Sequence, residues 1–231
     1  MIRAWNWLKR FLLACCALLL LYQLWLFGWV LWWNWVNPEH TRFMALRLEE
    51  LQQKDPQAGL KQQWVNYDRI SRHLKHAIIA AEDAKFVDHE GFDWEGIQLA
   101  IEKNQKRGRV VAGGSTISQQ LAKNLFLTPA KTPWRKAEEA IITLMLEGVW
   151  SKQRIFEVYL NVIEWGNGVF GAEAAARHYY GVSAAQLSRE QAARLAGMVP
   201  SPRFYDRHRN APGLAKKTAI ILARMPSADV P

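Results

Sequence analysis

An apolar segment near the N-terminus constrains the fold of this chain more than any other feature. From Phe11 to Trp33 the 231-residue sequence is interrupted only by Tyr22 and Gln23. A helix of that length measures roughly 35 Å, which is enough to cross a hydrocarbon core of about 30 Å. Seven of the 12 tryptophans fall in the first 36 residues. Four of them crowd one end of the segment, as in an interfacial aromatic belt: Trp29, Trp32, Trp33 and Trp35. We therefore predict one transmembrane helix over residues 11–36.

The charges around this segment predict its orientation. Arg3, Lys9 and Arg10 precede it without any acid, whereas bases and acids are mixed after it. The positive-inside rule places residues 1–10 in the cytoplasm and the rest of the chain outside it. A cleaved signal peptide is the alternative, but its apolar region would span only about 7 to 15 residues, and no small-residue cleavage site follows Trp33.

The chain beyond residue 36 has the composition of one globular domain. Half of all residues are apolar, which excludes intrinsic disorder, and the only cysteines, Cys15 and Cys16, lie inside the apolar segment, which excludes a disulfide framework. All 21 acids and 27 of the 30 bases follow residue 36, a net charge of +6 that favours anionic partners. An anchor in this orientation holds the domain beside lipid head groups and away from nucleic acid, so we expect no nucleic-acid partner. We predict a juxtamembrane linker over 37–64 and a domain over 65–231.

The apolar spacing in this domain is helical. Ser71, Asp93 and the pair Thr132-Pro133 are typical of helix starts, and a glycine-rich loop is expected over 166–171. No alternating strand series is present, so the fold class is predicted to be mainly α. The expected helices cover 71–85, 94–107, a segment from Ser115 or Thr116 to before Pro129, a segment from 132, 152–163, 172–178, 188–198 and 214–225.

Three polar segments carry the candidate chemistry, and each has a plain structural alternative. Carboxylates gather over 82–93 at the end of an apolar helix, where the helix dipole disfavours a negative charge and should raise a carboxyl pKa, as a general base or acid requires. The alternative is a solvated acidic cluster. His89 lacks a second histidine four residues later, so no zinc motif and no metal ligand set is present.

The second segment, Gly113-Gly114-Ser115-Thr116, leads into a helix and could present free backbone N–H groups to a phosphate. It could equally be a glycine turn before an ordinary amphipathic helix. In the third segment, Arg135, Lys136 and Glu139 offer two cations and a carboxylate, or only an exposed ion pair worth about 0.3 to 0.5 kcal/mol. Residue spacing alone does not distinguish the binding role of each segment from its structural alternative.

Four ordered motifs together resemble glycosyltransferase family 51, the peptidoglycan glycosyltransferases, and specifically its monofunctional membrane-anchored members. The resemblance covers about residues 65 to 205. Its motifs are Glu82-Asp83-x-x-Phe86-x-x-His89-x-Gly91, Gly113-Gly114-Ser115-Thr116-Ile117-Ser118-Gln119-Gln120-Leu121-Ala122-Lys123-Asn124, Arg135-Lys136-x-x-Glu139 and Arg154-Ile155-x-Glu157-x-Tyr159-Leu160-Asn161.

The resemblance implies a lysozyme-like α fold and the polymerisation of lipid II into β-1,4-linked glycan, with release of undecaprenyl pyrophosphate, for cell-wall synthesis. It implies that Glu82 is the general base and that Glu139 assists departure of the lipid pyrophosphate. It also implies a set of substrate-binding positions: Asp83, Phe86, His89, Gly114, Ser115, Thr116, Gln119, Gln120, Lys123, Asn124, Arg135, Lys136 and Arg154.

The expected partners are lipid II, the growing glycan chain, the membrane and other cell-wall synthesis proteins. No cofactor is implied with certainty, and a divalent cation at the pyrophosphate is left open. The resemblance and the anchor together imply an inner (cytoplasmic) membrane protein with a periplasmic catalytic domain. The Ser-x-x-Lys and Lys-Thr-Gly motifs of a transpeptidase are absent, so crosslinking is not expected. Two rival hypotheses are a lysozyme-type or lytic enzyme that cleaves glycan, and a non-catalytic anchored scaffold.

Overall fold

The computed structural model describes residues 2–109 and 113–231. Within these residues the chain separates into two compact units, Met1–Asn37 and Pro38–Pro231. The first unit is built on a single long helix, and the second contains the remaining secondary structure.

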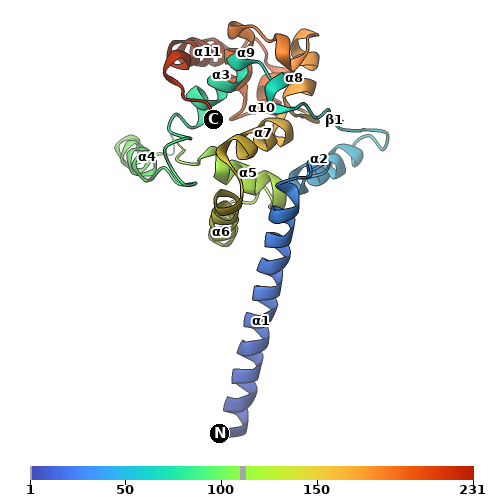
Figure 1. Ribbon diagram of the computed structural model, residues 1–231, viewed down its shortest axis with the longest axis vertical. Coiled ribbons are helices and arrows are strands. Elements are labelled where there is room, and N and C mark those ends of the chain that lie inside the picture. Colours follow the sequence, from blue (N-terminus) through green and yellow to red (C-terminus); the bar gives the residue numbers. More distant parts are fainter. Residues whose placement is uncertain (1, 110–112) are drawn as a thin grey trace. The chain divides into compact units, whose positions relative to one another are not determined.

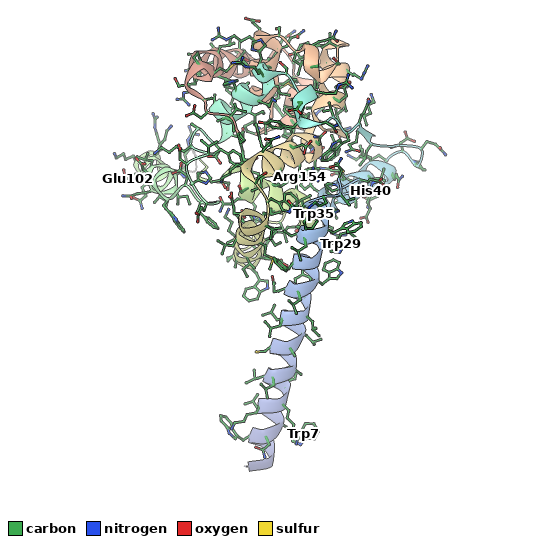
Figure 2. All side chains as sticks on the ribbon, in the orientation of Figure 1. Trp7, Trp29, Trp35, His40, Glu102 and Arg154 are labelled. Carbon is green, nitrogen blue, oxygen red and sulfur yellow. The ribbon has the colours of Figure 1, made fainter. Side chains whose placement is uncertain are left out.

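The first unit contains α1, an unbroken helix over Ile2–Trp33 (Figure 1). It begins earlier than the predicted membrane segment, because residues 2–10 contain no helix breaker and continue the same helix. Its span Trp5–Trp33 is the one stretch of the described residues that is long and apolar enough to cross a membrane. Trp7 lies near its start and Trp29 near its end (Figure 2), as expected for aromatic side chains at the two faces of a bilayer.

The second unit is mainly helical, which confirms the predicted fold class. Its 3-10 turns are η1 (Tyr67–Arg69), η2 (Ala184–Gln186) and η3 (Met225–Ser227). Its α-helices are α2 (Arg42–Gln52), α3 (Arg72–Glu82), α4 (Trp94–Arg107), α5 (Ile117–Phe126), α6 (Pro133–Val149), α7 (Lys152–Val162), α8 (Ala172–Tyr180), α9 (Arg189–Met198), α10 (Pro202–Arg207) and α11 (Pro212–Arg224).

The predicted helix starts agree with the observed caps. The side chains of Ser71, Asp93 and Thr132 each accept a backbone N–H in the first turn of α3, α4 and α6. Of the two alternatives for α5, Thr116 is the N-cap and Ser115 precedes the helix. These caps define where each helix begins, because the first-turn N–H groups have no partner within the helix.

The sequence prediction missed three features. The segment 37–64, expected to be a linker, contains α2 and the short strand β1 (Lys61–Gln62), and α10 was not anticipated. The expected loop over 166–171 is only partly correct: β2 (Glu164–Gly166) and β3 (Val169–Phe170) form a hairpin whose turn is Asn167-Gly168, and β1 pairs with β3 in parallel. Strands this short leave no alternation to detect, and only the positive φ of Gly168 (72°) marks the turn.

Helix packing in the second unit brings distant segments together. The central helix α5 packs against α2, α6 and α7, and α9 packs against both α3 and α11 (Figure 1). The side chains of Phe86, Phe156 and Tyr159 are fully buried and form an aromatic cluster between these helices. The end of α3 is thereby held beside α5 and α7, and this is where the candidate site lies.

Candidate active site

Glu82 is the last residue of α3 and the centre of the candidate site. One of its carboxylate oxygens, Oε2, accepts a hydrogen bond from the side-chain amide of Gln120 at 2.9 Å. Burial raises the pKa of Glu82 above its usual range, although the hydrogen bond from Gln120 and the nearby ammonium groups of Lys217 and Lys123 act in the opposite direction. A carboxylate with a raised pKa is suited to taking up a proton.

Gln120, in α5, connects Glu82 to the core. Its amide N–H group donates to Glu82, while its carbonyl Oε1 accepts from the hydroxyl of Tyr159 in α7 at 2.9 Å. The backbone carbonyl of Gln120 accepts from the side chain of Asn124, also a predicted substrate-binding residue, at 2.7 Å. Three helices therefore contribute to the position of one catalytic candidate.

The neighbouring acid, Asp83, is used differently. Its side chain is buried and accepts from the backbone N–H of Ile117 at 3.0 Å, while His89 Nε2 lies 3.0 Å from its other oxygen. Phe86 is fully buried against Phe156, with ring centroids 5.7 Å apart. These contacts give the first motif a positioning role, because they fix the end of α3 to the start of α5. The direct substrate contacts expected of Asp83, Phe86 and His89 stay predictions.

Three backbone N–H groups at the start of α5, which the sequence suggested to be free, are paired within the protein. The N–H of Thr116 donates to Oε1 of Gln119, the N–H of Gln119 donates to the Thr116 hydroxyl, and the N–H of Ile117 donates to Asp83. The Thr116 hydroxyl itself donates to the carbonyl of Gly91 at 2.7 Å. A capping box and a buried carboxylate thus satisfy the N–H groups of Thr116, Ile117 and Gln119, and the binding of a phosphate by residues 113–116 stays a prediction.

The residues before this helix lie close to two other elements. A Cβ on Gly114 would lie 3.0 Å from the Cα of Ile97 in α4, so only glycine fits this approach without displacement. The hydroxyl of Ser115 accepts from the ammonium of Lys136 in α6 at 3.3 Å. The second and third motifs thus meet at Ser115.

The third motif forms a cluster of charges around a buried carboxylate. Glu139 is only 3% exposed, and both of its oxygens are paired, one with Arg135 and one with Lys136. Lys123 approaches from α5, and burial lowers its pKa although the charge of Glu139 opposes this effect. In the described residues no hydrogen bond or ion pair is formed by the Lys123 ammonium. An anion that entered here would meet Lys123 directly.

Arg154 is not brought into this arrangement. It lies in the first turn of α7, where it pairs with Glu157 at 2.9 Å and its guanidinium lies over the rings of Trp64 and Trp150. Arg154 lines neither the cavity beside Gln120 nor the cavity beside Glu82. Its predicted substrate contact has no support in this geometry and stays a prediction.

Two cavities are lined by candidate residues. The larger, about 900 Å³, is lined by Gln120, Lys123 and Asn124 of α5, with Arg47 of α2 and Arg203 of α10 among its other walls. The smaller, about 190 Å³, is lined by Glu82 and by residues 113–116. Glu82 thus lines the smaller cavity, and its hydrogen-bond partner Gln120 lines the larger one.

Sequence reasoning overlooked two residues that act on Glu82. Tyr159 stands in the fourth motif but was given no role, and Lys217 lies in α11, outside every motif. No spacing rule would have found Lys217, since it is 135 residues from Glu82 in the sequence. Within residues 2–109 and 113–231, no group of three or more His, Cys, Asp or Glu side chains is arranged to hold a metal ion.

Comparison with known proteins identifies the family of this chain. The family model described as Transglycosylase matches residues 47–226. The chain belongs to this transglycosylase family, which confirms the resemblance expected from the four motifs and the lysozyme-like, mainly α fold class.

Curated relatives match over nearly the whole chain. A protein of Dechloromonas aromatica (strain RCB) is 79% identical over 226 residues, 98% of either chain. Proteins of Nitrosospira multiformis and Chromobacterium violaceum are 64% and 62% identical, covering 97% or more of this chain and 98% of each relative. All three are named biosynthetic peptidoglycan transglycosylase.

Proposed function

We propose that this chain is a monofunctional, biosynthetic peptidoglycan transglycosylase. It polymerises lipid II into β-1,4-linked glycan strands, releases undecaprenyl pyrophosphate and has no transpeptidase activity. The names of the relatives support the cell-wall role. The observation that carries the chemistry is the carboxylate of Glu82, whose pKa is raised by burial and which lies beside a cluster of cations.

In this proposal Glu82 is the general base. It takes the proton of the 4-hydroxyl of the acceptor sugar while that oxygen bonds to the anomeric carbon of the growing chain. The bond from the anomeric carbon to the pyrophosphate breaks, and its electron pair leaves with the lipid diphosphate. Attack opposite the leaving group inverts the α-linked donor into a β-linkage.

The departing diphosphate needs positive charge that is already in place. Lys123 is unpaired within the described residues, and Arg135 and Lys136 are held at fixed positions by the buried Glu139. Glu139 therefore assists departure by holding two cations, which the diphosphate oxygens contact together with Lys123. The hydroxyl of Ser115, already bonded to Lys136, completes the polar wall.

The lipid part of the substrate has support in α6. The side of this helix opposite Glu139 exposes Trp134 (80%), Ile141 (43%) and Leu144 (59%). One helix thus carries charges toward the site and an apolar face away from it, as expected of an element that binds a lipid-linked diphosphate at a membrane surface. Together with α1, this favours a single-pass inner-membrane protein with a cytoplasmic N-terminus and a periplasmic catalytic domain.

A divalent cation at the pyrophosphate is a separate part of the proposal. Because both oxygens of Glu139 are paired, such an ion would have to displace Arg135 or Lys136, or be held mainly by the diphosphate. Polymerisation measured across a titration with a chelator, and after adding back magnesium, tests this dependence.

The deciding experiment uses the detergent-solubilised full chain with labelled lipid II. We expect a ladder of polymer from the wild type, which a muramidase converts to disaccharide units. Glu82→Gln should give no ladder, and Glu90→Gln, the same change at an exposed site in the same segment, should polymerise normally.

Other outcomes favour the rival hypotheses. Release of muropeptides or anhydro-sugars from purified sacculi, with lipid II untouched, would support a lytic enzyme. Lipid II that is bound but unchanged by folded protein, together with undiminished function of Glu82→Gln in cells, would support a scaffold.

A further inference from the structure

We propose that Tyr159 is a positioning residue for the proposed reaction: its hydroxyl holds the side-chain amide of Gln120 so that the N–H group, and not the carbonyl oxygen, faces Glu82. This inference rests on the proposed function for the role of Glu82 as a base. Its structural basis is the continuous chain of hydrogen bonds from Tyr159 to Gln120 and from Gln120 to Glu82, each 2.9 Å long.

The direction of these hydrogen bonds follows from the chemistry of the three groups. An ionised carboxylate only accepts, so the Gln120 amide must present its N–H group to Glu82. Its carbonyl oxygen then faces Tyr159, and only a hydroxyl that donates satisfies it. Tyr159 is fully buried, and burial together with the charges of Glu82 and Asp83 raises the pKa of its hydroxyl, so the donor proton is retained.

Tyr159 is the rigid end of this chain. Its ring is 0% exposed and stacks on Phe156 with centroids 6.5 Å apart, so the hydroxyl has a fixed position. The amide of Gln120 can rotate by half a turn about its last bond with almost no change in shape. Such a rotation would place the carbonyl oxygen against the Glu82 carboxylate, where two acceptors repel. The hydroxyl of Tyr159 disfavours that orientation because it would lose its own acceptor.

The consequence for Glu82 is a preference for the ionised form before each turnover. The Gln120 hydrogen bond stabilises the carboxylate and offsets part of the effect of burial. Other charged groups also act on Glu82: Asp83 beside it, Lys123 from α5 and Lys217 from α11. Arg224 and Asp93 line the same small cavity. A change at Tyr159 that removes only the hydroxyl leaves all of these groups in place.

The test compares Tyr159→Phe with Tyr67→Phe. Tyr67 is a matched control because it packs on the same Phe156 ring, with centroids 6.3 Å apart, while its hydroxyl bonds to the backbone of Pro231. The measurement is the pH profile of kcat/KM for lipid II polymerisation. In Tyr159→Phe the acid limb of this profile should shift to higher pH by about 0.5 to 1 unit. At a given pH on that limb, this shift is a three- to tenfold loss of kcat/KM. Tyr67→Phe should leave the limb unmoved.

A double variant separates positioning from a general loss of structure. If Tyr159 acts through the amide, adding Tyr159→Phe to a Gln120→Met background should not move the acid limb further. If Tyr159→Phe lowers the plateau value of kcat/KM but leaves the acid limb at the same pH, the hydroxyl only supports packing. That result would overturn the inference.

A direct titration makes the inference independent of turnover. Carbon-13 NMR of labelled glutamate side chains, with Glu82→Gln to assign the signal, reports the pKa of Glu82 in the full chain in detergent. An upward shift in Tyr159→Phe supports the inference, and an unchanged value overturns it. Failure of the wild type to polymerise lipid II would instead overturn the proposed function, and the titration would still decide whether Tyr159 controls the Glu82 carboxylate.

Discussion

Asp83→Asn tests whether the acid next to the proposed base touches substrate or holds the site together. In the structure the Asp83 carboxylate accepts from the N–H of Ile117 and lies 3.0 Å from His89 Nε2. Asparagine keeps one oxygen and replaces the other with an amide nitrogen, which cannot accept a hydrogen bond. The oxygen that remains is needed by the N–H of Ile117, so the amide N–H must face His89 Nε2, and the imidazole then carries its proton on Nδ1. Nδ1 is buried without a hydrogen-bond partner, so the substitution leaves a buried donor unsatisfied.

The size of the effect follows from that loss. A buried donor without an acceptor costs about 1 to 3 kcal/mol of the free energy of unfolding. For a domain of this size, about 2 to 4 °C per kcal/mol converts this into an unfolding midpoint about 2 to 12 °C lower. Because Ile117 is the first residue of α5 and Gln120 lies one turn later, we also expect a lower kcat with KM changed less than about twofold.

The assay combines thermal unfolding of the solubilised chain with polymerisation kinetics. Asp88→Asn is the control, since it makes the same chemical change at an exposed position in the same segment. An unchanged midpoint with a KM raised several-fold would refute the reasoning, because it would mean that Asp83 binds substrate directly and contributes little to the junction of α3 and α5.

Three further variants probe the remaining assignments. Glu82→Gln should abolish polymerisation without lowering the unfolding midpoint at neutral pH. A carboxyl group whose pKa is raised by folding stabilises the folded protein below its unfolded pKa, and this contribution is lost as pH rises through the folded pKa. Removing the carboxyl group is therefore neutral or favourable for stability at neutral pH. A marked drop in the midpoint near pH 7 would make Glu82 structural. Glu139→Gln should lower kcat more than it raises KM, because Arg135 loses its buried partner; a loss of substrate affinity alone would argue against the assigned role. Arg154→Lys should lower the unfolding midpoint with little change in KM, since the guanidinium pairs with Glu157 outside both cavities; a KM raised at constant stability would restore the predicted substrate contact.

Much of the helical architecture was predictable from the sequence. Helix starts at Ser71, Asp93 and Thr132 carry a local signal, since a short polar side chain satisfies N–H groups two or three residues away. The apolar segment that forms α1 is equally local, because its length and composition alone suit a membrane.

The parts that failed depend on contacts between distant residues. The pairing of β1 with β3 joins Lys61 to Val169, and no pattern within either two-residue strand indicates it. The pairing of the Ile117 N–H at the start of α5 was missed for a similar reason. The N–H of Ile117 is taken by Asp83, which lies 34 residues earlier in the chain, so local sequence could not show that the group is occupied.

The candidate site shows the same division between local and long-range information. The sequence by itself determined which residues are candidates and on which helices most of them stand, because motifs and caps are local in the chain. Only the tertiary structure decided how adjacent residues are used. Glu82 and Asp83 are consecutive acids that line the same small cavity, yet Glu82 accepts from the side chain of Gln120, while Asp83 accepts from the backbone N–H of Ile117. The physical reason is that α3 ends between them, and the hydrogen bonds that fix the two carboxylates come from different groups of α5, which only folding brings beside α3.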